Sequence, residues 1–291
     1  MKTICFFYHG GNNAGDHYCN PGLYYDFDDY ERMAGNILEL RANEERGNII
    51  TDSILIFGGG GIIDVTSTMS RLYANLDSSN RCFHWSSGSN RLNPKEIDWK
   101  LNPDEIDVQD DILEHFVLVG RRDFGKERQY ENHRYVPCVS CKLRPLTRRY
   151  TVKRKIGIVN HMFLKKINGL DYPTIDMNLT KHKIDAIIRF IAESEIILTS
   201  SYHGAYWGFL LNKKVVINGN WSTKFDTLKY QPAHLSNDLS SDIEKCVQPS
   251  TDYLHECMEL NDQFYQTVMQ SLAGDSVVNE KTTPQPPSPP S

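Results

Sequence analysis

A short polar stretch interrupts an apolar segment of the chain. Within LTSSYHGAYWGFLLNKKVVI (198–217), the central residues are Ser200, Ser201, Tyr202, His203 and Gly204. Histidine titrates near neutral pH, so His203 can act as a general acid or base or donate a hydrogen bond to a phosphate. A helix that begins here would add backbone amides that favour anions. We predict His203 as a catalytic residue and its four neighbours as substrate-binding residues; a structural histidine and serine helix caps are the alternatives.

Two further groups of polar residues follow apolar segments. NNAGD (12–16) supplies Asp16, which can take a proton from a hydroxyl group or cap the helix behind the loop. In either case, Asn12, Asn13 and Gly15 shape the loop and are predicted to bind substrate. His161 ends the apolar stretch KIGIVNH and is the third predicted catalytic residue.

Glycine-rich and basic groups end other apolar segments. GGGG (58–61) lets the backbone approach a ligand or another part of the chain closely, and we assign Gly59 and Gly60 to substrate binding. The sequence GSN ends with Asn90, which we assign in the same way. In RRD (121–123), we assign Arg121 and Arg122 to substrate binding: one would bind an anion while the other pairs with Asp123, and a purely structural pair is the alternative.

These groups must be positioned by the elements that precede them. Apolar segments predict strands within 3–9, 53–64, 81–90, 115–123, 134–141, 155–161, 196–200 and 214–219. Helical spacing predicts helices over 30–45, 63–77, 180–195 with Thr180 as N-cap, 204–211, and much of 240–274. Alternating strands and helices indicate largely parallel α/β sheets, whose ligands bind beyond the carboxyl ends of the strands.

The order of these elements predicts two Rossmann-like domains that face a cleft. Residues 1–145 would form the acceptor side and 150–272 the donor side. The remaining residues, 273–291, are rich in Pro and Ser and are predicted to be disordered.

Composition excludes several classes of partner. The 291 residues carry a net charge of −5, which gives no general attraction to nucleic acid or anionic lipid. The apolar start is too short for a signal peptide, and no run approaches the roughly 20 residues of a membrane span, so we predict a cytoplasmic protein.

Seven cysteines are scattered along the chain, and CVSC (138–141) has no second ligand pair at similar spacing. Zinc or redox roles for this pair are alternatives to simple packing, and we predict no metal site and no cofactor.

Taken in order, NNAGD, GGGG, GSN, RRD, HMF, SSYHGAYWG and STKFDTL resemble the polysaccharide pyruvyl transferase family. The resemblance covers about residues 5–230. It implies a GT-B-like fold and transfer of a pyruvyl ketal from phosphoenolpyruvate to a sugar of a glycan. It also implies a substrate-binding role for Lys224, in the last motif.

The family signature Ser-x-Arg-x-His-Gly matches at His203 and Gly204, but Ser201 or Tyr202 takes the place of its arginine. Arginine clamps phosphate or carboxylate through a fork of donors. Arg121, Arg122 or Lys224 would have to replace it.

Two other functions fit the same residues. One is a GT-B glycosyltransferase that uses a nucleotide sugar, with a glycan, a lipid-linked sugar or a hydroxylated base in DNA as acceptor. For DNA, the basic stretch at 143–155 would be the contact surface. The other is a non-catalytic protein that binds a sugar or nucleotide. The missing arginine favours the glycosyltransferase over the pyruvyl transferase.

Overall fold

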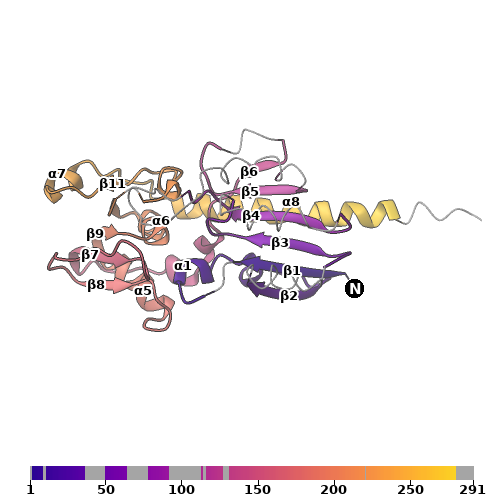
Figure 1. The fold of residues 1–291 in the computed structure, drawn as a ribbon, viewed down its shortest axis with the longest axis horizontal. Coiled ribbons are helices and arrows are strands. Elements are labelled where there is room, and N and C mark those ends of the chain that lie inside the picture. The colour runs from indigo at the N-terminus through magenta and orange to yellow at the C-terminus, as the bar shows by residue number, and fades with distance from the viewer. Residues whose placement is uncertain are drawn as a thin grey trace, which may run out of the picture.

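The computed structural model describes residues 2–8, 11–36, 50–63, 78–91, 113, 116–126, 131–219 and 221–279. Within these ranges the chain forms two parallel β-sheets that lie next to each other along the long axis of the molecule (Figure 1). Helices accompany both sheets. The predicted α/β class with two parallel sheets is confirmed.

The described part of the first half contains a six-stranded parallel sheet in the order β2-β1-β3-β4-β5-β6. Its strands are β1 (Thr3–Tyr8), β2 (Glu31–Asn36), β3 (Ile54–Gly58), β4 (Arg81–Ser87), β5 (Leu118–Arg121) and β6 (His133–Tyr135). Every residue of β3 is buried, because both faces of a central parallel strand are covered. This explains why its sequence is continuously apolar rather than alternating.

The described part of the second half contains a five-stranded parallel sheet in the order β11-β10-β9-β7-β8. Its strands are β7 (Arg154–Asn160), β8 (Thr174–Asp176), β9 (Ser194–Thr199), β10 (Lys214–Ile217) and β11 (Ala233–His234).

The helices differ in how they are buried. The described ones are α1 (Ala14–His17), α5 (Ile184–Ala192), α6 (Tyr202–Leu210), α7 (Leu239–Glu244) and α8 (Tyr253–Asn279), with short 3-10 helices η1 (Pro21–Leu23), η4 (Val139–Lys142), η5 (Arg144–Thr147) and η6 (Thr223–Phe225). One face of α5 is buried, as its isoleucine spacing predicts. All nine residues of α6 are buried, because the first half covers the side that the second sheet leaves free.

The long helix α8 connects the two halves. Its first turns place Tyr253 and Cys257 in the same apolar cluster as α6, whereas Phe264 and Val268 pack with the first sheet. The Phe264 ring meets the Trp85 ring of β4 edge-on, with centroids 5.1 Å apart. In Figure 1, α8 (yellow) accordingly runs from the second half along the first sheet. The chain therefore returns to its first half after completing the second.

Four local predictions need correction. The helix expected over 30–45 is wrong at 31–36, where β2 pairs with β1 along its length; Met33 is exposed, so the apolar spacing there did not mark a buried helix face. Thr180 is not an N-cap, because α5 begins at Ile184. The strand expected over 134–141 ends at Tyr135 and gives way to η4.

The fourth correction concerns the tail. Residues 273–279 continue α8, so the expectation of disorder is wrong there. Residues 280–291, and the parts of predicted helices at 37–45 and 64–77, lie outside the described residues.

Candidate active site

The two halves meet at the loop that follows β1. The Ala14 N–H donates to the Met177 carbonyl at 3.0 Å, and the Leu179 N–H donates to the Asn12 carbonyl at 2.8 Å. Helix α1 lies between the two sheets as a result (Figure 1). The predicted loop at 12–16 thus faces the carboxyl ends of the second sheet.

Within this loop, Asn13 takes the capping role and leaves Asp16 uncommitted. The Asn13 side-chain oxygen accepts from the Gly15 N–H at 3.1 Å at the start of α1. The half-buried Asp16 carboxylate has no hydrogen bond or ion pair among the described residues. Of the two roles considered for Asp16, the helix cap is therefore filled by another residue.

His203 lies at the first turn of α6, where the sequence places it. Ser201 caps this helix by accepting from the Gly204 N–H at 3.5 Å. The ring of His203 packs against Gly15: a Cβ atom at Gly15 would lie 2.0 Å from Nδ1. Only glycine fits this contact, which brings two predicted site residues together. We call this contact region between the two halves, formed by the 12–16 loop and the start of α6, the joint.

The neighbours of His203 have structural contacts of their own. The Ser200 hydroxyl oxygen accepts from the His161 N–H at 2.9 Å. A Cβ at Gly204 would lie 2.3 Å from Thr199 Oγ1, so this glycine lets α6 pack closely on β9.

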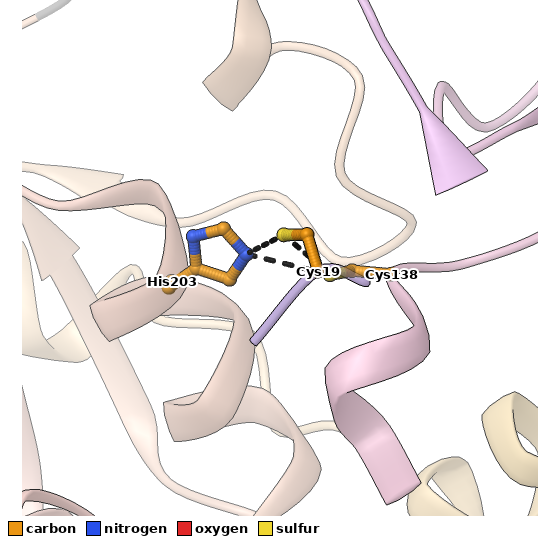
Figure 2. Close-up of side chains that lie close together, drawn as sticks. All are labelled: Cys19, Cys138 and His203. Atoms are coloured by element: carbon orange, nitrogen blue, oxygen red, sulfur yellow. Dashed lines mark hydrogen bonds between the residues drawn. The ribbon is translucent and has the colours of Figure 1, made fainter. Parts of the chain in front are cut away.

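The side chains of two cysteines lie next to Nε2 of the His203 ring (Figure 2). Cys19 Sγ and Cys138 Sγ each lie 3.4 Å from His203 Nε2 and 3.5 Å from each other, and all three side chains are buried. Burial opposes ionisation of Cys138, but its contacts with Cys19 and His203 hold its pKa well below the usual range. The hydrogen bond with Cys138, together with burial, raises the pKa of Cys19.

Sequence reasoning missed this cluster. Cys19 lies 119 residues before Cys138, and His203 comes from the other half. No short spacing in the sequence signals such a group.

His161 has hydrogen-bond contacts at both of its ring nitrogens. Its Nδ1 accepts from the Phe163 and Leu164 N–H groups at 3.2 and 3.1 Å. Burial and, to a lesser extent, the nearby Lys224 charge lower the pKa of His161 to about 4. On the other side of the ring, the Asn13 amide nitrogen, which can only donate, lies 3.2 Å from His161 Nε2.

Arg122 brings a buried positive charge to the joint. Its side chain crosses Gly88, where a Cβ would lie 2.6 Å from Arg122 Nε. The guanidinium carbon lies 4.0 Å from the centroid of the Tyr202 ring. The Arg122 side chain is 3% exposed, and its Nε and Nη1 are buried without a hydrogen-bond partner among the described residues. Such a group favours an anion, because a buried charge is costly until it is paired.

Lys224, in η6 of the second half, is a second buried cation. Burial lowers its pKa to about 7; Arg122 adds to the lowering, and Asp16 opposes it. The ammonium lies 3.9 Å from the centroid of the Trp221 ring and has no hydrogen bond or ion pair within the described ranges. The charges of Arg122 and Asp16 in the first half therefore both act on Lys224 in the second half.

Arg121 differs from its neighbour Arg122. Arg121 Nη2 lies 3.5 Å from Asp123 Oδ2 in a buried ion pair. Asp123 also accepts from the Ser89 N–H at 2.8 Å and from the Thr227 hydroxyl at 2.9 Å. Arg121 thus lies in a structural network.

The glycine run and Asn90 contact protein groups. A Cβ at Gly59 would lie 2.2 Å from Cys19 Cβ, and its φ of +52° also favours glycine. Gly60 has a φ of +76°. The Asn90 side-chain oxygen accepts from the Ser222 hydroxyl of the second half at 2.7 Å. The close approach at Gly59 and the hydrogen bond of Asn90 are therefore contacts within the protein.

A cavity of about 360 Å³ lies in the second half, beyond the carboxyl ends of β7, β10 and β11. Its polar lining comes from Lys166, Asn168, Asn218, Ser236 and Asn237. Parallel sheets bind ligands in this position. These residues were not predicted from the sequence.

No known protein-family model and no curated protein matches the chain. Three solved structures show weak similarity to the chain. A functionally uncharacterized protein from Klebsiella pneumoniae shares 17% identity over 78% of this chain and 87% of its own, with a TM-score of 0.48.

An α-glucosyltransferase in complex with UDP-glucose and DNA containing an abasic site shares 10% identity over 90% and 92%, with a TM-score of 0.40. The ADP-heptose LPS heptosyltransferase II of E. coli shares 13% identity over 91% and 100%, with a TM-score of 0.27. Similarity at this level does not bear on the function of the present chain. Separately, none of the described helices is long and apolar enough to cross a membrane.

Proposed function

We propose that the protein is a transferase that binds a phosphate-bearing donor at the joint and transfers a group to a sugar-containing acceptor. The specific form is transfer of a pyruvyl ketal from phosphoenolpyruvate to a glycan. The observation that carries the proposal is the buried, unpaired guanidinium of Arg122 over the Tyr202 ring. The Arg122 guanidinium lies over Tyr202, which is one of the two positions where the family that the sequence resembles would have its arginine.

The charges at the joint suit this donor. Phosphoenolpyruvate carries a phosphate and a carboxylate, and Arg122 can bind either group through a pair of N–H donors. Lys224 supplies a second cation from the other half, so the donor would contact both halves. Neither cation forms an ion pair within the described residues.

The uncommitted carboxylate of Asp16 supplies the base. It would take the proton of an acceptor hydroxyl as that oxygen attacks the central carbon of the donor. Both ring nitrogens of His161 already have protein contacts, so we assign the base to Asp16 rather than to His161.

The overall reaction balances without a redox partner. Two acceptor hydroxyls form two C–O bonds to the central carbon of phosphoenolpyruvate, and phosphate leaves. One hydroxyl proton ends on the former methylene carbon, which becomes a methyl group, and the other ends on the phosphate.

A nucleotide-sugar donor is the second candidate. It is favoured by the 360 Å³ cavity at the strand ends of the second half, which has the size of a small-molecule site. In this case the diphosphate would bind the same two cations, and Asp16 would deprotonate a glycan or modified-DNA hydroxyl.

The decisive experiment is a donor screen by thermal shift with phosphoenolpyruvate and with UDP-, GDP- and CMP-sugars. We expect phosphoenolpyruvate to stabilise the wild type and the Asp16→Asn variant but not Arg122→Gln. Arg149→Gln, at an exposed position, is the matched control. Stabilisation by a nucleotide sugar alone would replace the first candidate with the second.

Binding by neither class would refute both candidates and favour the non-catalytic alternative. Turnover of a bound donor that is unaffected by Asp16→Asn would refute the assigned base.

A further inference from the structure

The cluster of Cys19, Cys138 and His203 has no task in the transfer reaction proposed above. All three side chains are buried, at 0%, 0% and 4% exposure. Two of them come from the first half and the third from α6 of the second half, so the cluster spans the joint (Figure 2).

We propose that Cys19, Cys138 and His203 bind one zinc ion, which fastens the two halves together. Thiolate sulfur and imidazole nitrogen are the ligands that zinc favours in proteins. The proposal goes beyond the transferase function and does not depend on it.

The three ligand atoms already have the spacing that zinc requires. With Zn–S and Zn–N bonds of usual length, a tetrahedral centre separates two sulfurs by about 3.8 Å and a sulfur from a nitrogen by about 3.6 Å. The structure has 3.5 Å between the sulfurs and 3.4 Å from each sulfur to Nε2. An ion bonded to all three would lie about 1 Å outside their plane, which leaves one position for a fourth ligand such as water.

The surroundings of Cys138 fit a thiolate ligand. Trp207 Nε1 donates to the Ser140 hydroxyl oxygen at 3.0 Å. The Ser140 hydrogen is then free to point to Cys138 Sγ, 3.2 Å away. A donor in the outer shell of this kind orients a metal ligand and stabilises its charge.

Charge balance also favours a divalent ion. On binding, both thiols would lose their protons to solvent, and the two thiolates would neutralise the ion. His203 would bind in its neutral form through Nε2, with its hydrogen on Nδ1. The Cys19 thiol would give up its hydrogen bond to the Gly15 carbonyl, now 3.0 Å from the sulfur. The buried site would then carry no net charge, whereas an isolated charge there is costly.

The ion would join three segments that are far apart in the sequence. These are the turn after α1, the start of η4 and the first turn of α6. Metal binding to a site of this kind adds its free energy to folding.

The test is to purify the full-length protein without chelators and to measure its metal content by elemental mass spectrometry. We expect one zinc per chain in the wild type, and none in Cys19→Ser, Cys138→Ser or His203→Asn. Cys141→Ser and Cys257→Ser, both at buried cysteines outside the cluster, should keep the ion. A wild type that contains no zinc and takes none up from zinc buffer would overturn the proposal, as would zinc retained by all three ligand variants.

A second measurement covers the case in which the ligand variants do not fold. The wild type, stripped of metal and reloaded with cobalt, should show the intense visible absorption of a tetrahedral site with thiolate ligands. A disulfide between Cys19 and Cys138 in the protein as purified would instead refute the site. Neither measurement involves a donor, so failure here is distinct from failure of the proposed function.

Discussion

Replacing Lys224 with methionine should stabilise the free protein and weaken its binding of an anionic donor. Burial lowers the pKa of Lys224 from 10.5 to about 7. The difference between these two values corresponds to about 5 kcal/mol, at about 1.4 kcal/mol per pKa unit. Contacts of the ammonium with the Trp221 ring offset about 1–2 kcal/mol of this cost. The variant should therefore gain about 3 kcal/mol in free energy of unfolding at pH 7.

The gain should depend on pH in a defined direction. Between pH 7 and 10.5 the folded wild type binds fewer protons than the unfolded chain, because the folded pKa of Lys224 is the lower one. The stability of the wild type therefore rises with pH across this window, while methionine does not titrate. The advantage of the variant should be fully present at and below pH 7 and should shrink as the pH approaches 10.5.

Donor binding should show the opposite trend. An anion at the joint requires a protonated Lys224, so above pH 7 the wild type must take up a proton on binding. Its affinity for phosphoenolpyruvate should fall by up to about tenfold per pH unit above pH 7. The Lys224→Met variant should bind more weakly at pH 7 and lose this dependence.

Urea unfolding at pH 7 and pH 9.5, with binding measured by calorimetry, tests both expectations. Lys183→Met, at an exposed position, controls for the loss of a positive charge. A Lys224→Met variant that is no more stable than the wild type at pH 7 would refute the reasoning. So would a gain of the same size at both pH values.

Three other predictions concern the joint and α8. Gly15→Ala would drive a methyl group into the His203 ring and should cost about 1–3 kcal/mol, measured by urea unfolding. Asp123→Asn would remove the carboxylate charge from the buried ion pair with Arg121 and should cost about 3–5 kcal/mol in the same assay. Phe264→Ala should cost about 3–5 kcal/mol and increase hydrogen exchange in the first sheet rather than the second, because Phe264 packs there; an effect confined to the second sheet would contradict the placement of α8.

The strands of both sheets were largely predictable, because buried parallel strands are continuous apolar runs. β1, β3 and β10 each contain such a run and lie within their predicted segments, and β7 begins one residue before its predicted segment. β2 was not predictable in this way. It is an edge strand whose residues from Glu31 to Ala34 are exposed, so pairing with β1 rather than an apolar pattern determines its conformation.

The path of α8 could not be predicted for a different reason. Helical spacing shows that a face will be buried but not which sheet will bury it. Tyr253 and Phe264 belong to the same helix, yet they pack in the clusters of different halves. Position along the sequence suggested a single C-terminal domain, whereas packing divides the helix between both.

For the candidate site, the sequence predicted which strands and loops would contribute residues, but not which side chains would contact each other. Placing NNAGD and His203 at the ends of parallel strands was enough to expect them at one joint. It could not show that Gly15 would lie against the His203 ring or that Cys19 would lie beside Cys138. These contacts depend on how the two halves dock, which no local pattern encodes.

The docking of the halves also changes what the glycine-rich loops imply. A glycine run after a parallel strand permits close approach, but the approaching group can be a ligand or another segment of the same chain. Gly15 and Gly59 approach side chains of the joint, and Gly88 makes room for Arg122. These glycines therefore build the joint, and the ligand must be sought where charge remains unpaired. Among the predicted site residues that the structure describes, only Arg122, Lys224 and Asp16 lie at the joint and carry a charge without an ion-pair partner. We therefore place the proposed donor beside these three side chains and not beside the glycines.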